Sequence, residues 1–180
     1  MSEENQNEIA RNILAALYDA WVHHLGISLN SLRDSEHWEK ADFAFVIDRL
    51  KDRGFIKNGT SNSFRLTPAG IVHVEDNAMV PEAEIERHRE LRTKALAFLE
   101  DFYQKNGSRA AANVDAIAEG CGVDRLFVDL SFLKDLGYIK NASVTSYRIT
   151  HDGRGIIMVR TTKRLSELFS SMPHFCEAEP

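Results

Sequence analysis

Apolar residues recur at helical spacing along much of the chain, and the first such pattern lies near the N-terminus. It predicts a helix over residues 8–25 with one stripe facing a core. The stripe consists of Ile9, Ile13, Ala16, Leu17, Ala20 and His24. A second apolar set, Leu14, Tyr18, Trp21 and Leu25, widens the buried face. This width indicates either packing against two neighbouring elements, which we favour, or a contact with a partner or a second copy of the chain in a homodimer.

The rest of the first half predicts two further helices, a β-hairpin and a helix that follows the hairpin. Gly26 ends the first helix, and Asn58-Gly59 is a strong hairpin-turn signal. Thr67 and Pro68 suit the N-cap and first position of a helix. The expected elements are a short helix around Leu29 and Leu32 with Ser28 or Asn30 as its cap, a helix over 36–53, strands over 55–57 and 64–66, and a helix from Pro68 that ends before Pro81.

The second half repeats this order behind one long helix. The expected elements are a helix over 82–105, a short helix holding Val114, Ile117 and Ala118, a turn at Gly120-Cys121-Gly122, a helix over 124–136, strands within 138–149, and a final helix capped by Thr150. The outward side of the long helix carries charged residues and His88 at spacings of three or four. The apolar side of the final helix continues to Met172, and residues 173–180 read as a disordered tail.

The two halves contain an internal repeat. A constant shift of 83 aligns residues 50–70 with residues 133–153 without a gap, and eleven of the 21 pairs are identical. Most identities have structural roles, such as Gly at a helix exit and Thr at a cap; Lys57/Lys140 and Arg65/Arg148 are the functional candidates. Self-similarity of this kind predicts two copies of one unit. We therefore expect a mainly α fold with small β-hairpins (α+β), with domains at 8–81 and 82–172.

Composition and charge narrow the function classes. The chain has 180 residues and a net charge of −5. Residues 1–81 hold 8 Lys and Arg against 12 Asp and Glu, and residues 82–180 hold 14 against 15, so a nucleic-acid interface must be a local patch. No apolar run is long enough for a membrane span, the N-terminus is too polar for a secretory signal, and the two cysteines have no CxxC spacing. These features predict a cytoplasmic protein without a membrane partner.

Three helices, a hairpin and a helix opened by Thr resemble the winged-helix fold. The carriers are the segments IAEGCGV and LKDLGYI in the second half and the hairpin leading into LTPAG in the first. The likeness covers about residues 10–77 and 94–160, although the first copy has a longer turn before its third helix. It implies two tandem winged-helix domains joined by a long helix, and duplex DNA as the partner of a transcriptional regulator.

In DNA-binding winged-helix proteins the third helix enters the major groove and the wing contacts phosphates or the minor groove. The outward third-helix positions are then Ala41, Asp42, Phe45, Val46 and Arg49 in the first copy, and Asp124, Arg125, Val128, Asp129 and Phe132 in the second. Each set offers a single Arg for base readout, among acidic and apolar neighbours. The DNA-binding candidates are Arg49, Lys57, Arg65, Arg125, Lys140 and Arg148.

The alternative is a protein-interaction module that uses the same acidic scaffold. It rests on apolar residues at positions that a DNA reader keeps polar, namely Phe45, Val46, Val128 and Phe132. The sequence favours DNA binding over this alternative on the strength of the fold resemblance, which is an analogy at the level of the fold.

Catalysis and metal binding have little support in the sequence. His23 and His24 are adjacent and diverge around a helix, and no set of three or four convergent ligands has metal-site spacing. No nucleophile elbow, phosphate loop or carboxylate pair is present. Cys121 falls where a helix-turn-helix buries a small apolar residue, which favours a core thiol over a redox sensor. We expect no enzyme activity, no metal and no cofactor.

Overall fold

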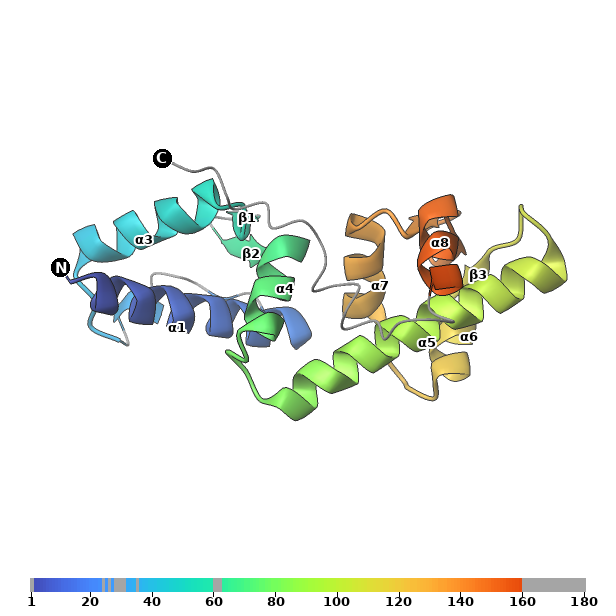
Figure 1. Cartoon of the computed structure of the whole chain (residues 1–180), viewed down its shortest axis with the longest axis horizontal. Coiled ribbons are helices and arrows are strands. Elements are labelled where there is room, and N and C mark those ends of the chain that lie inside the picture. The colour runs from blue at the N-terminus through green and yellow to red at the C-terminus, as the bar shows by residue number, and fades with distance from the viewer. Residues whose placement is uncertain are drawn as a thin grey trace. The chain divides into compact units, whose positions relative to one another are not determined.

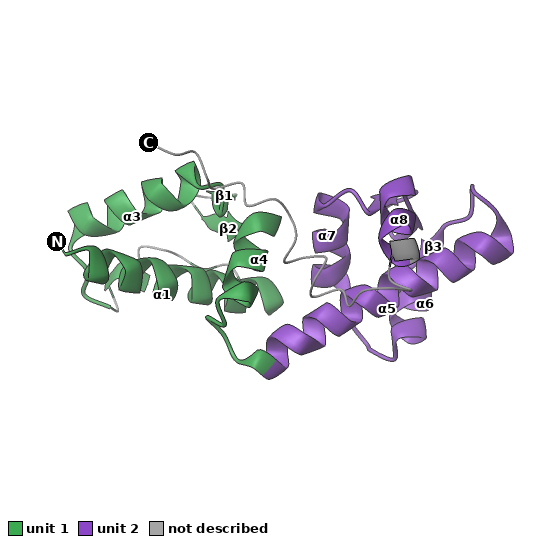
Figure 2. Cartoon of the chain, viewed as in Figure 1, with its two compact units in different colours: residues 1–82, 175–180 green, residues 83–174 purple. Residues whose placement is uncertain are grey.

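The computed structural model shows a mixed α+β protein that is mostly helical (Figure 1). It describes residues 2–23, 25, 27, 32–34, 36–59 and 63–159. The chain divides into two compact units, which lie within residues 1–82 and 83–174 (Figure 2). We call them unit 1 and unit 2. The expected class, mainly α with small hairpins, is confirmed at this level.

Unit 1 is built on a long N-terminal helix. Its elements are α1 (Glu3–Val22), α3 (Lys40–Asp52), β1 (Ile56–Asn58), β2 (Phe64–Leu66) and α4 (Pro68–Asp76). The helix α1 packs against α3, β2 and α4, and the stripe residues Ile9, Ile13 and Leu17 are buried there. It begins five residues before the predicted start because the Ser2 side chain caps it by accepting a hydrogen bond from the Asn5 N–H.

Two of the helices predicted in unit 1 agree with the structure only in part. The helix expected over 36–53 spans Lys40–Asp52. Residues 32–34 are helical, but Gly26, Ser28, Leu29 and Asn30 lie outside the described residues, so the predicted short helix is described only at that end. The predicted hairpin is present, and β1 pairs antiparallel with β2, with Ile56 opposite Leu66.

Unit 2 repeats the order with one additional strand. Its elements are α5 (Glu82–Asn106), β3 (Ala112–Asn113), α6 (Val114–Cys121), α7 (Phe127–Asp135), β4 (Ile139–Asn141), β5 (Ser146–Ile149) and α8 (His151–Val159). The strands form an antiparallel sheet of order β3-β5-β4. The sequence did not reveal β3, because two residues are too few to show alternation. The predicted continuation of the last helix and the tail at 173–180 lie outside the described residues.

The start of α7 differs from the prediction. The helix begins at Phe127 instead of residue 124, and Leu126 is its N-cap residue, with no side-chain hydrogen bond to the helix. Asp124 and Arg125 therefore lie in the turn before the helix, and neither is part of its face.

The repeated stretch builds the same joint in both units. Each Thr hydroxyl, of Thr67 and Thr150, accepts a hydrogen bond from the backbone N–H three residues later, at 3.1 Å in both units. The same hydroxyl donates to the carbonyl thirteen residues earlier, that of Gly54 at 2.5 Å and that of Gly137 at 2.7 Å. Both glycines have positive φ, 70° and 78°, where residues other than Gly are strained. The cap thus fixes the hairpin and the following helix to the exit of the third helix.

A second pair of repeated glycines permits close packing at this joint. A Cβ atom at Gly70 would lie 2.1 Å from the carbonyl oxygen of Phe55, and a Cβ atom at Gly153 would lie 2.1 Å from that of Tyr138. No side chain fits at that separation. These identities of the repeat therefore serve the fold in both units.

Candidate nucleic-acid interface

Both hairpins place two cations directly opposite each other. Lys57 faces Arg65 across β1 and β2, and Lys140 faces Arg148 across β4 and β5. Like charges in directly opposed positions of an antiparallel pair are destabilising. The repeat therefore carries the same unfavourable pair twice, at the positions expected to contact phosphate.

The surroundings of these four cations differ between the hairpins. Lys57, Arg65 and Lys140 are exposed, whereas Arg148 is half-buried. The Nε atom of Arg148 is buried, and no hydrogen-bond partner for it lies among the residues that the structure describes. The hairpin of unit 1 therefore presents both of its cations to solvent, and that of unit 2 presents mainly Lys140.

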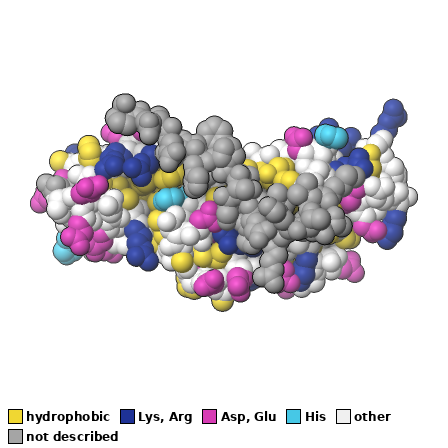
Figure 3. All heavy atoms as spheres, viewed as in Figure 1, with side chains coloured by type: hydrophobic (Ala, Val, Ile, Leu, Met, Phe, Trp, Pro, Cys, Tyr) yellow, Lys and Arg dark blue, Asp and Glu magenta, His cyan; other side chains and the backbone are white. Residues whose placement is uncertain are grey.

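Unit 1 adds further cations from the last turns of α3 and the residue after it. Residues 49–66 hold five Lys and Arg against one Asp, whereas the equivalent residues 132–149 hold three against one. We call the five side chains of unit 1 the basic surface: Arg49, Lys51, Arg53, Lys57 and Arg65. In Figure 3, Lys and Arg side chains gather over α3. The negative net charge of the chain therefore conceals a positive region on unit 1.

Contacts hold two of these side chains against unit 1. The Arg49 guanidinium donates to the Gln6 side-chain oxygen at 2.8 Å and lies 5.8 Å from the Phe45 ring centroid. The Lys51 ammonium lies 4.8 Å from the Phe64 ring centroid, which links α3 to β2. Burial, followed by the positive charge of Arg53, lowers the pKa of His73 on α4. Arg53 therefore lies close enough to α4 to act on a titratable group there.

Three of the four partner-interface candidates are not surface residues. Val46, Val128 and Phe132 are buried, so the expectation that they face outward is wrong. Val46 lies three residues after Phe43 and four before Leu50, which places it within the buried stripe of α3. Phe45 alone is exposed as expected, with 50 % of its surface accessible.

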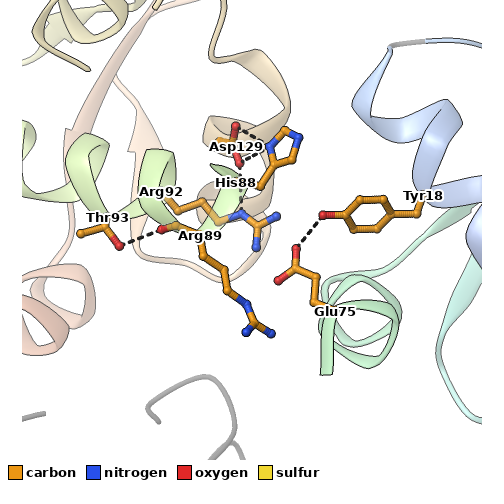
Figure 4. Close-up of polar contacts among 7 residues, drawn as sticks. All are labelled: Tyr18, Glu75, His88, Arg89, Arg92, Thr93 and Asp129. Carbon is orange, nitrogen blue, oxygen red and sulfur yellow. Dashed lines mark hydrogen bonds and ion pairs between the residues drawn. The ribbon is translucent and has the colours of Figure 1, made fainter. Parts of the chain in front are cut away.

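In unit 2 the corresponding helix, α7, is held to α5 by buried charged side chains. Asp129 was expected to face outward, and His88 to lie on the charged side of its helix, but both are buried. Asp129 accepts a hydrogen bond from the Arg92 Nε at 3.1 Å, and its two oxygens lie 3.1 Å from the His88 Nδ1 (Figure 4). Arg92 also lies over the Phe132 ring, 4.0 Å from its centroid. This buried ionic cluster joins α5 to α7.

In unit 1 the equivalent positions hold apolar residues in place of the buried charges. The 83-residue shift places Ile9 at the position of Arg92 and Val46 at the position of Asp129. Ile9 and Val46 are buried where α1 packs on α3, as Arg92 and Asp129 are buried in unit 2. A charged residue is rarely buried unless it is paired, so the outward assignment of Asp129 followed the usual rule. The one signal in the sequence that Asp129 is buried is Arg92, which lies on the apolar side of the preceding helix.

The turn between α6 and α7 is acidic. An open hollow of about 380 Å³ there is lined by Asp115, Ala118, Glu119, Gly122, Val123 and Asp124. Arg125 is exposed in this turn. The carboxylates of Asp115 and Glu119 on α6 and of Asp124 in the turn repel a polyanion. Unit 2 is therefore the less favourable of the two for nucleic acid.

The described residues give little support for redox chemistry, metal binding or a membrane span. Cys121 is buried, as expected for a core thiol, and burial raises the pKa of this thiol. Among the residues that the structure describes, no three His, Cys, Asp or Glu side chains converge as metal ligands do, and no helix is long and apolar enough to cross a bilayer. Comparison with protein-family models, curated proteins and solved structures returned no match.

Proposed function

We propose that the chain is a tandem winged-helix protein that binds duplex DNA and acts as a transcriptional regulator. The order of elements behind the resemblance recurs in unit 2 as α5, α6, α7, a β-hairpin and a Thr-capped α8. Unit 1 has α1, helical residues 32–34, α3, a hairpin and a Thr-capped α4 in the same order. This order supports the fold assignment, and the function rests on the charges that the fold displays.

The observation that carries the function is the like-charged pair across each hairpin. Lys57 opposite Arg65, and Lys140 opposite Arg148, cost stability in the isolated protein. A phosphate backbone that lies along the hairpin offsets this repulsion, because it brings negative charge close to both cations and its counterions leave the DNA. An arrangement that is unfavourable alone and favourable with a polyanion supports a phosphate-binding wing.

Unit 1 is the principal contact in this proposal. Its hairpin cations are both exposed and continue into Arg49, Lys51 and Arg53, whereas in unit 2 Arg148 is half-buried and an acidic hollow lies at α6 and the turn after it. Phosphate contacts position a protein on DNA without reading its sequence. The basic surface therefore accounts for affinity and leaves specificity to other residues.

Replacing Lys57 and Arg65 together by Ala will weaken binding of the full chain to a mixed-sequence duplex. We expect a loss of roughly tenfold near physiological salt, and a slope of log affinity against log salt that falls by about two. Fluorescence anisotropy over a salt series measures both quantities.

The matched control is the equivalent pair of unit 2, Lys140 and Arg148, replaced by Ala in the same way. We expect this variant to lose less affinity and less slope, because Arg148 is half-buried. Circular dichroism checks that both variants are folded. Absence of binding to duplex DNA at low salt, or no change on removing Lys57 and Arg65, would overturn the proposal and favour the protein-interaction alternative, which now rests on Phe45.

A further inference from the structure

The outward face of α3 is apolar over its first turns. Ala41, Ala44 and Phe45 are exposed, and half of the Phe45 surface is accessible. Asp48 follows on the same face one turn later. No Arg, Lys, Asn or Gln stands at these four positions, and the adjoining Arg49 is half-buried with its guanidinium donating to the Gln6 side-chain oxygen. These four positions therefore offer no side chain for bidentate hydrogen bonds to purines.

Charge complementarity indicates what covers this face. The second half of α3 and the adjoining hairpin carry the basic surface, whose five cations are opposed by two carboxylates, Asp52 and the Asp48 that lies 3.5 Å from the Lys51 ammonium. Arg49 lies over the Phe45 ring, so the apolar face and the basic surface are continuous. An apolar protein partner does not require flanking cations, whereas the major groove of DNA is bordered by phosphates on both sides.

One base presents an apolar group in the major groove. Thymine carries a C5 methyl group there, and Ala and Phe side chains contact it. Cytosine carries an amino group whose N–H can donate a hydrogen bond to a carboxylate such as that of Asp48.

We propose that α3 reads thymine methyl groups in the major groove, with Phe45 as the main contact. This inference rests on the proposed function and deepens it, because it names the feature of DNA that unit 1 distinguishes. Unit 2 lacks an equivalent reader: the shift of 83 places Asp124 at the position of Ala41 and the buried Val128 at that of Phe45.

The test compares duplexes of one mixed sequence synthesised with either thymine or uracil. The two bases have the same charge and hydrogen-bonding groups, and uracil lacks only the methyl group. We expect the full chain to bind the uracil duplex roughly fourfold more weakly for each methyl group that is removed from the interface. Phe45→Ala is expected to bind both duplexes equally, with the salt slope of the wild type.

The matched control is Phe127→Ala, because Phe127 is also 50 % exposed but lies on α7 of unit 2. It must retain the preference for thymine, which also excludes a general effect of uracil on duplex shape. Equal binding of the wild type to both duplexes, or a preference that survives Phe45→Ala, overturns methyl reading. In that case the salt dependence and the Lys57/Arg65 variant still support DNA binding; if the wild type binds neither duplex, the proposed function itself fails.

Discussion

Replacing Asp129 by Val will lower the free energy of unfolding of unit 2 by about 3–5 kcal/mol, the range for breaking a buried ion pair. The substitution removes the carboxylate that Arg92 and His88 share, and all three side chains are buried. Arg92 has 1 % of its surface exposed, so its charge has no access to water in the folded unit.

Urea denaturation followed by far-ultraviolet circular dichroism measures this loss. Both tryptophans of the chain, Trp21 and Trp38, lie in unit 1. Tryptophan fluorescence therefore reports on unit 1, and we expect its transition to stay where it is in the wild type. A loss below about 1 kcal/mol would show that the cluster is not a buried ion pair in solution.

A double variant uses the solution found in unit 1 as its control. Arg92→Ile with Asp129→Val copies Ile9 and Val46 into unit 2. Replacing a buried ion pair by well-packed apolar residues is often neutral or stabilising. We therefore expect the double variant to recover most of the stability that Asp129→Val removes, which attributes the destabilisation to the uncompensated charge.

Replacing either repeated glycine by Ala, at Gly70 or Gly153, will destabilise its own unit by about 3 kcal/mol, the upper part of the usual range for overpacking. The added methyl group would lie 2.1 Å from a backbone carbonyl oxygen. That carbonyl, of Phe55 or Tyr138, also accepts the N–H of the capping Thr at 2.9 or 3.0 Å, so a shift to relieve the clash disrupts the cap.

The two variants have separate readouts and a common control. Gly70→Ala is expected to shift the tryptophan transition of unit 1, and Gly153→Ala to shift circular dichroism alone. Gly155 lies on α8, and among the described residues no atom lies within 4 Å of an added Cβ atom there. Gly155→Ala should be neutral or stabilise by up to about 1 kcal/mol, because Ala favours helix. Equal effects at Gly153 and Gly155 would contradict the close packing.

Local signals were sufficient to predict most of the elements. The Asn58-Gly59 turn, the Thr67-Pro68 helix start and the regular stripe of the long helix each indicate one structure, and the repeat supports the same order twice. The two-residue β3 carries no such signal, because it exists only through its pairing with β5. Helix ends depend on caps, as at Ser2, which a stripe of apolar residues does not reveal.

The sequence predicts the parts of the candidate site that follow from the order of residues along the chain. It does not predict which side chains are buried by packing between helices. Both predicted hairpins are present, and their paired strands carry Lys57, Arg65, Lys140 and Arg148. The spacing of Val46 from Phe43 and Leu50 assigns it to the buried stripe, so the expectation that it faces outward is wrong. The local sequence does not predict the burial of Asp129, because its partner Arg92 is 37 residues away; the position of Arg92 on the apolar side of its own helix is a distant signal for it.

The buried ionic cluster also bears on how two similar units assemble correctly in one chain. Adjacent repeats risk exchanging helices during folding. If α1 packed on α7, Asp129 would be buried against Ile9; if α5 packed on α3, Arg92 would be buried against Val46. Either exchange leaves an unpaired charge buried among apolar side chains. The difference between the units therefore opposes domain swapping. The double variant Arg92→Ile/Asp129→Val removes this barrier, and we expect it to form more swapped or aggregated species on refolding, measured by size-exclusion chromatography, although its monomer is stable.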